Sequence, residues 1–240
     1  MSSRARLSGA VAAAASAEPS PRAPHLALDA ATERVRSGAF GPEDARNLLD
    51  ELRQPAGTLV PGRALNGFLA ALARAPPSAA CSDGPALAVT FFNGMARAAG
   101  PRVLSPSFHT YGILIDCCNR VRCPGLALAF FGRLLRTGLG VNAIILSYLL
   151  TGLCEAKRTD DGLDMVLYRM PELGFVPNVV SYNILLKSFC NNRESRRALE
   201  LLRRMAEKGS GCPPDVVSFR TIRSSMASLR RVKSLKGVIY

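Results

Sequence analysis

The chain repeats itself with a period of about 36 residues, and this periodicity constrains its fold more than any other feature. The motifs TYGILI, SYLLTG and SYNILL align with one another and mark repeats at residues 108–142, 143–178 and 179–215. A fourth start, VVSFRTI, begins at Val216. Each repeat has an aromatic residue near its start, an apolar second half followed by glycine, and a closing Asn or Asp.

Two amphipathic helices are predicted within residues 179–215. The first helix carries apolar side chains at i, i+3, i+4 and i+7, namely Tyr182, Leu185, Leu186 and Phe189. The second has the same spacing at Ala198, Leu201, Leu202 and Met205, and Gly209 with Pro213-Pro214 ends it. One such hairpin cannot bury its apolar side alone. We therefore predict an all-α fold, a right-handed α-solenoid of stacked helix-turn-helix repeats.

The charge of the chain indicates an anionic partner. Its 240 residues include 31 Lys and Arg against 18 Asp and Glu, a net charge of +13. Nucleic acid is the first candidate for such a partner. The alternative is a basic organellar protein whose charge serves import and solubility. The sequence contains no uninterrupted run of 18 apolar residues, so no membrane-spanning helix is predicted.

No enzymatic chemistry is predicted. The two histidines, His25 and His109, are far apart in the sequence, and no catalytic or phosphate-binding motif is present. The seven cysteines form no Cys-x-x-Cys pair, which disfavours a zinc site. The acids Asp160, Asp161 and Asp164 fit a helix start better than a metal site. The chain is predicted to be no enzyme and to bind no cofactor, metal or small-molecule substrate.

The N-terminal third is less regular. Residues 1–28 combine Arg, Ser and Ala in the manner of a mitochondrial or chloroplast transit peptide, or of a disordered tail without an address. Residues 29–63 are predicted to form one capping helix, entered at Pro42-Glu43-Asp44, and a linker. Residues 64–107 read as a degenerate repeat with an expanded loop, APPSAACSDGP.

The repeats resemble the pentatricopeptide repeat family of RNA-binding proteins. The residues that carry the resemblance are Val179 to Asn183, Gly152 to Ala156, Ala198 to Leu201, and Pro214-Asp215. The match is to plant fertility-restorer-like members with plain repeats and covers residues 108–222. The tetratricopeptide repeat is the nearest rival, but its signature includes Trp, and the chain has none.

The resemblance implies binding of single-stranded organellar RNA at one base per repeat, in transcript processing, stability or translation. It favours mitochondria, with chloroplasts as the alternative. The fifth and last residues of a repeat would read the base: Gly112 with Asn142, Ser147 with Asn178, and Asn183 with Asp215. The second residues would wedge against the bases: His109, Ile144, Val180 and Val217. By family precedent, the Asn/Asp pair favours uracil and the Ser/Asn pair favours adenine. We expect the degenerate repeat to pack on the next repeat and to contact RNA weakly, if at all.

Two alternatives to this function remain open. The repeats can instead form a protein-interaction scaffold, in which Asn and Asp at the repeat ends only stop helices, or the chain is an inactive truncated paralogue. Residues 216–240 form an incomplete repeat with a divergent basic tail. The usual continuation in such repeats resembles INGFFKEG, and a codon choice for it read one base later encodes Ser225 to Arg231. This suggests a frameshifted or truncated relative of a longer protein.

Overall fold

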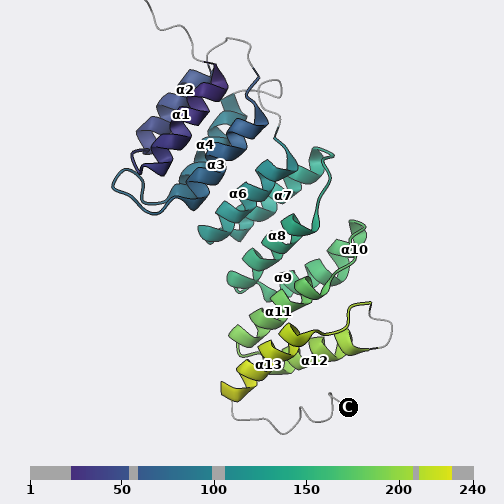
Figure 1. Ribbon diagram of the computed structural model, residues 1–240. Helices are drawn as coiled ribbons and strands as arrows, with labels where there is room; N and C mark the ends of the chain where they lie inside the picture. Colours follow the sequence, from purple (N-terminus) through teal and green to yellow (C-terminus); the bar gives the residue numbers. More distant parts are fainter. Residues whose placement is uncertain (1–22, 54–58, 99–105, 208–210, 229–240) are drawn as a thin grey trace, which may run out of the picture.

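The structure is a computed structural model that describes residues 23–53, 59–98, 106–207 and 211–228, with the side chains of residues 98 and 226–228 left aside. Within these ranges the regular elements are helices, and they follow one another as antiparallel pairs in a single stack (Figure 1). The predicted all-α solenoid is confirmed. The predicted transit peptide lies almost entirely outside the described residues.

The helix pairs each consist of elements that are consecutive in the sequence. They are α1 (Pro24–Arg36) with α2 (Pro42–Arg53), α3 (Gly62–Arg74) with α4 (Gly84–Ala98), α6 (Phe108–Arg120) with α7 (Pro124–Arg136), α8 (Ala143–Glu155) with α9 (Thr159–Asp164), η1 (Met165–Arg169) and α10 (Met170–Glu172), α11 (Val179–Asn191) with α12 (Ser195–Ala206), and finally α13 (Val216–Ser228). The helices α6, α8, α11 and α13 begin at the residues where the sequence places the repeat starts.

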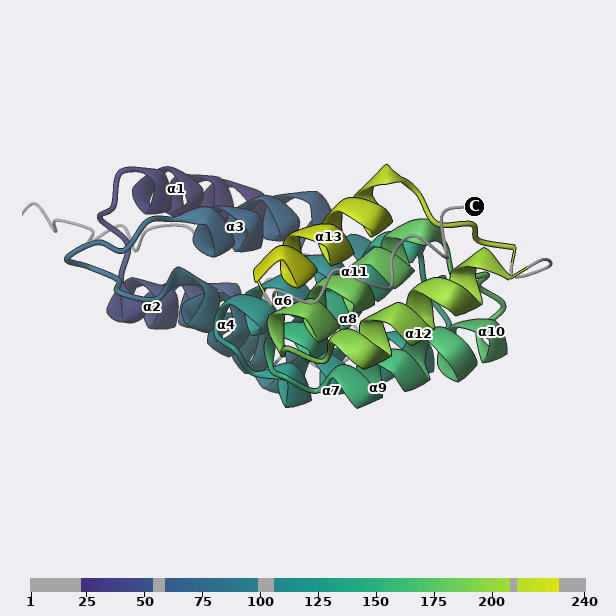
Figure 2. The same cartoon turned by 90° about the horizontal axis from the view of Figure 1, so that it is seen from below.

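The first helix of each pair packs on the first helix of the next. Contacts link α1 to α3, α3 to α6, α6 to α8, α8 to α11 and α11 to α13. Figure 2 shows the second helices α2, α4, α9, α10 and α12 on the opposite side of the stack from α1, α3, α11 and α13. We call the surface formed by the first helices α3, α6, α8, α11 and α13 the first-helix face.

The turns inside the pairs α1/α2, α6/α7, α8/α9 and α11/α12 share one geometry, which the longer loop between α3 and α4 lacks. Residues Arg122, Lys157 and Arg193 adopt the left-handed conformation, with φ of 54°, 60° and 63°. The following residue donates its N–H five residues back, as in the 2.8 Å bond from Glu194 N to Phe189 O. This is the Schellman ending of a helix. Gly38, with φ of 74°, occupies the same place between α1 and α2.

The N-terminal region differs from the sequence prediction. Residues 24–53 form two helices rather than one, and α1 begins inside the segment predicted to be a disordered transit peptide. Pro24 starts α1, where a missing backbone N–H is harmless, and Leu28 and Val35 are buried. The last five residues of the predicted transit peptide, 24–28, therefore belong to a helix that packs on α3.

The core runs without interruption from pair to pair. Its largest fully buried side chains include Phe68, Phe92 and Phe189. Phe92 of α4 lies against the rings of Tyr111 and Phe130 in the following pair, with centroids 6.4 and 6.0 Å away. In the degenerate repeat, Leu65, Leu69 and Met95 are buried in the same core. Residues 62–98 therefore extend the stack despite their irregular loop.

Gly152 allows a close approach of α6 and α8. A Cβ at this position would lie 1.9 Å from Asn119 Oδ1, a contact that no side chain can make. Asn119 also donates from Nδ2 to the backbone oxygen of Tyr148, 2.7 Å away. The glycine of the GLCEA motif thus has a packing role between two repeats.

The second helix of residues 143–178 is widened by one π-helical turn, η1, directly before Pro171. Proline has no backbone N–H and its ring collides with a carbonyl one turn earlier in a regular α-helix. A π turn relieves such a conflict. Met165, Val166 and Met170 still face the core. Among the described helices, none is both long and apolar enough to cross a membrane.

Candidate nucleic-acid interface

The last residue of each repeat caps the next first helix. Asn142 Oδ1 accepts from Ile145 N at 2.9 Å, and Asn178 Oδ1 accepts from Ser181 N at 3.0 Å. Asp215 Oδ1 accepts from Ser218 N at 2.8 Å. These side chains satisfy free amide groups at helix starts. All three predicted last-position readers are therefore held at the N-terminal edge of the first-helix face.

Asn183 and Asp215 are brought together, as the sequence pairs them. Asn183 Nδ2 donates to Asp215 Oδ1 at 3.1 Å, across the junction between α11 and α13. Ser218 Oγ donates to Asn183 Oδ1 at 2.6 Å, so both ends of the amide are engaged. The backbone N–H of Ser218 and, next, the Asn183 amide hold the pKa of Asp215 below its ordinary value. The pair presents a fixed amide beside an ionised carboxylate.

Ser147 and Asn178 are arranged differently. Ser147 Oγ donates to the backbone oxygen of Ala143, 2.8 Å away in its own helix. Asn178 Oδ1 accepts from Ser181 N and from Ser181 Oγ at 3.2 Å. The serine hydroxyl is attached to Cβ and reaches less far than an asparagine amide. It bonds to a backbone oxygen of its own helix, as serines in helices often do.

Gly112 lines a cavity on the first-helix face. The cavity has a volume of about 260 Å³ and lies where α3, α6 and α8 meet. Its walls include the predicted base-contacting residues of one repeat, namely His109, Gly112, Asn142 and Ile144. A Cβ at Gly112 would have only one neighbour, Ile145 Cγ1 at 3.7 Å. The absent side chain therefore leaves open space.

The predicted wedging residues lie at equivalent, exposed places. Ile144 is 60% exposed, Val180 51% and Val217 45%, although they are large apolar side chains. His109 is also exposed, and its ring lies 4.0 Å from that of Phe108. Each follows the first residue of its helix, so the helical register places them in one row. Exposed apolar groups in a row mark a surface that can stack on planar ligands.

One polar pair escaped the sequence analysis. Asn66 of α3 donates from Nδ2 to Ser107 Oγ at 3.3 Å, in the repeat predicted to be degenerate. Because α3 begins at Gly62, Asn66 is its fifth residue, and Ser107 directly precedes α6. The available signal was Ser107, a standard helix cap before the TYGILI motif.

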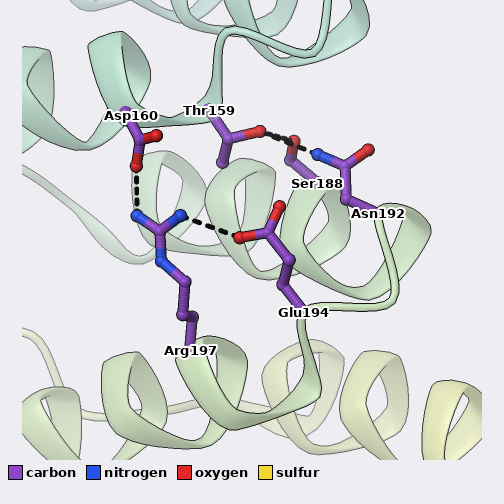
Figure 3. Close-up of polar contacts among 6 residues, drawn as sticks. All are labelled: Thr159, Asp160, Ser188, Asn192, Glu194 and Arg197. Atoms are coloured by element: carbon purple, nitrogen blue, oxygen red, sulfur yellow. Dashed lines mark hydrogen bonds and ion pairs between the residues drawn. The ribbon is translucent and has the colours of Figure 1, made fainter.

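Polar contacts on the opposite end of the first helices fix two repeats against each other (Figure 3). Thr159 Oγ1 of α9 lies 2.7 Å from Ser188 Oγ, and Asn192 Nδ2 donates to Thr159 at 3.0 Å. Arg197 pairs with Asp160 and, at 2.8 Å, with Glu194. The contacts of Thr159 and Asp160 join residues 143–178 to residues 179–215, and Glu194 holds Arg197 in place within its own repeat.

Other chemistry-bearing groups have structural partners. Asp161, in the first turn of α9, pairs with Arg158 at 2.7 Å, as the predicted helix start requires, whereas Asp164 is the last residue of α9 and pairs with Arg169 at 3.6 Å. Burial raises the pKa of the Cys117 and Cys118 thiols to about 12 and that of Cys154 to about 11. Such thiols stay protonated near neutral pH and are poor nucleophiles.

Comparisons with known proteins agree with this architecture. The PPR repeat family model matches residues 177–228, and the PPR repeat model matches residues 109–139. "Protein Rf1, mitochondrial" from Oryza sativa subsp. indica is 49% identical over 181 residues, covering 75% of this chain and 22% of Rf1. The chain thus spans about a fifth of that relative's length.

Solved structures share the fold. PPR10 in complex with an 18-nt psaJ RNA element superposes with a TM-score of 0.58 at 21% identity, over 85% of this chain and 30% of that one. The PPR domain of Arabidopsis thaliana protein-only RNase P 1, in complex with tRNA, gives 0.59 at 16% identity, over 85% and 99%. With the family matches and the similarity to Rf1, these findings confirm the predicted resemblance. The chain belongs to the pentatricopeptide repeat family, as a member of the fertility-restorer-like type.

Proposed function

We propose that this chain binds single-stranded RNA along the first-helix face, at one base per repeat, and acts in organellar transcript processing, stability or translation. The observation that carries the proposal is the preformed Asn183–Asp215 pair, whose ionised carboxylate and fixed amide face the same junction. An Asn amide both donates and accepts, so it matches a pyrimidine edge. Asp215 accepts only, which suits the N3–H of uracil and disfavours the bare N3 of cytosine.

The charge of the face supports an RNA backbone. Exposed basic side chains on the first-helix face include Arg63, Arg74, Lys187, Arg220 and Arg223. Stacking contributes about 1–3 kcal/mol per base, so three repeats offer weak affinity once the strand has been ordered. We expect micromolar or poorer binding that falls steeply with salt. The chain would act by binding, since His25 and His109 belong to helices of different pairs.

The composition of residues 1–28 supports import into an organelle, and the name of the similar Rf1 protein includes "mitochondrial". We propose mitochondria, with chloroplasts as the alternative. Fusing residues 1–60 to a fluorescent protein should direct it to mitochondria. A diffuse cytosolic signal would contradict the transit peptide, and chloroplast import would correct the organelle.

The test of base reading exchanges one pair for its neighbour. Asn183→Ser with Asp215→Asn copies the Ser147/Asn178 pair. For RNA that runs parallel to the protein, as the resemblance implies, the preferred dinucleotide should change from 5′-A-U-3′ toward 5′-A-A-3′. Competition titrations with oligonucleotides that differ only at this base measure the change. Equal competition by both oligonucleotides for both proteins would refute the assigned readers. Binding of a peptide partner in place of RNA would favour the scaffold function, which the helix-capping role of Asn142 and Asn178 also fits.

A further inference from the structure

The turns α6/α7, α8/α9 and α11/α12 each hold a basic residue in the left-handed conformation. Arg122, Lys157 and Arg193 have φ of 54°, 60° and 63°. Glycine is the usual residue at this place after a helix, because a Cβ in this conformation crowds the following carbonyl oxygen. Gly38 occupies it between α1 and α2. Three successive repeats therefore keep a basic side chain where glycine would fit the backbone better.

The three basic side chains are exposed and have no partner in the fold. Within the described part of the chain, Arg122, Lys157 and Arg193 make no ion pair and no side-chain hydrogen bond. Several acids beside them are already engaged by other arginines, in the pairs Asp116–Arg120, Asp161–Arg158 and Glu194–Arg197. The three positive charges are therefore available to a ligand.

Arg122, Lys157 and Arg193 form one row across the stack, which we call the turn row. Each stands ten residues after the predicted fifth-position reader of its repeat, so it lies about 15 Å further along, or roughly three helical turns. Successive first helices pack on one another, so equivalent positions are neighbours. Asn192, directly before Arg193, donates to Thr159 Oγ1 at 3.0 Å, two residues after Lys157 (Figure 3). The turn row is thus separate from the predicted base readers.

The composition of these turns fits the phosphates of paired RNA. The described residues 121–123, 156–158 and 192–194 include no exposed large apolar side chain, whereas a protein interface needs an apolar or aromatic centre. They also include no aromatic residue, so an unpaired strand would find no ring on which to stack its bases. The bases of paired RNA are already stacked, and such RNA is recognised through its shape and its phosphates.

We propose that the turn row binds the phosphate backbone of a base-paired RNA segment that adjoins the single strand on the first-helix face. The inference rests on the proposed RNA binding and adds a second, sequence-independent contact at the other end of the first helices. Two linked contacts on one RNA raise the affinity, because the second binding event becomes intramolecular. A short array that reads few bases gains in this way the affinity that its readers lack.

The first experiment compares RNAs by fluorescence anisotropy with the full chain. One RNA is a short single strand that contains 5′-A-U-3′, and two others join this strand to a hairpin stem at its 5′ or its 3′ end. A fourth carries an unpaired extension with as many phosphates as the stem. The better stem should lower Kd about tenfold relative to the single strand, and the unpaired extension should lower it less. The slope of log K against log salt should steepen by about 2–3, for three neutralised phosphates.

The second experiment changes the whole turn row. The triple variant Arg122→Gly, Lys157→Gly and Arg193→Gly removes three charges and supplies the residue that a left-handed turn prefers. It should lose the advantage of the stem and bind the single strand as the charge-matched control below does. Its melting temperature, followed by circular dichroism, should be no lower than that of the wild type, which a purely structural role of the side chains would not allow.

The matched control removes the same charge elsewhere. Arg136, Arg203 and Arg204 are exposed near the C-terminal ends of α7 and α12, away from the turns at which these helices begin. Arg136→Gln with Arg203→Gln and Arg204→Gln should keep the stem advantage. Glu155 is exposed two residues before Lys157, so Glu155→Gln should strengthen binding of the stem.

The outcomes separate the turn row from the proposed base reading. The inference is overturned if the stem adds no more than the unpaired extension, if its advantage survives the glycine variant, or if the control variant removes it equally. Polyglutamate that displaces the stem at the same concentration as competing paired RNA would assign the row to an acidic protein instead.

Single-strand binding without a stem advantage leaves the proposed function intact. Binding of the stem through the turn row without discrimination at the single-stranded bases refutes the base reading and leaves the phosphate site standing. If the glycine variant melts below the wild type, the same triple change to Gln, which keeps the side-chain carbons, must still abolish the stem advantage. A stem advantage that persists in the Gln variant overturns the inference.

Discussion

The first helices of the repeats at 143–178 and 179–215 have the same length and begin after an asparagine cap, and they differ in how the fifth residue is held. Asn183 reaches across the junction and bonds to Asp215 and Ser218, whereas Ser147 bonds back to Ala143. The caps Asn178 and Asp215 are equivalent in place and in their bond to the next helix. One side chain therefore decides whether a reading group is fixed before the ligand arrives, and a fixed group loses less entropy on binding.

The largest expected effect comes from breaking the packing that both repeats share. Phe189 is 1% exposed, and the Arg197 guanidinium lies 4.6 Å from its ring centre. Phe189→Ala should lower the free energy of unfolding by about 3–5 kcal/mol. Urea denaturation measures it. Because α11 carries Asn183 and packs on α8, preferences at both bases should fall together. A loss confined to one base would show that the repeats read independently of their packing.

The next prediction compares truncation of the two fifth-position residues, Asn183 and Ser147. Asn183→Ala should remove about 1–3 kcal/mol of discrimination for uracil, because a preformed polar group is lost. Ser147→Ala should remove less than about 1 kcal/mol at the adjacent base, because that hydroxyl is already engaged with Ala143. Parallel titrations with oligonucleotides altered at one base measure both. Equal losses would mean that Ser147 changes partner when RNA binds.

These expectations show which parts of the molecule a sequence reveals. The three regular repeats are predictable because apolar spacing, glycine and a closing Asn or Asp all recur at one period. Helix α1 was not predicted, since its short Ala-rich sequence also fits a transit peptide. Asn66 was missed because α3 starts after Pro61 without a capping side chain, which hides the repeat register. No sequence pattern tells whether Ser147 bonds across a junction or to its own helix.

The two repeats also differ in how the residue that caps the next helix responds to pH. The pKa of Asp215 is lowered, so its contribution to stability is present above the ordinary carboxyl value of about 3.9 and is lost as pH falls through the depressed folded-state value. Asn178, at the equivalent place, does not titrate. The melting temperature of the wild type should therefore approach that of Asp215→Asn in acid and exceed it near pH 5 and above. A constant difference across this range would contradict the lowered pKa.

The smallest effect concerns the ion pair that joins the two repeats in Figure 3. Asp160 is 81% exposed and Arg197 41%, and exposed pairs contribute little, because water and salt screen them. Asp160→Asn should therefore lower stability by less than about 0.5 kcal/mol relative to Asp161→Asn. Asp161 is the matched control, since it shares the first turn of α9 and so the same helix-dipole effect, but pairs with Arg158 in its own repeat. The contacts among Thr159, Ser188 and Asn192, together with the apolar core between α8 and α11, should then hold the repeats together. If Asp160→Asn instead causes a large, salt-sensitive loss in urea denaturation, the charged contact fixes the stacking, and the two repeats are joined by electrostatics rather than by their buried side chains.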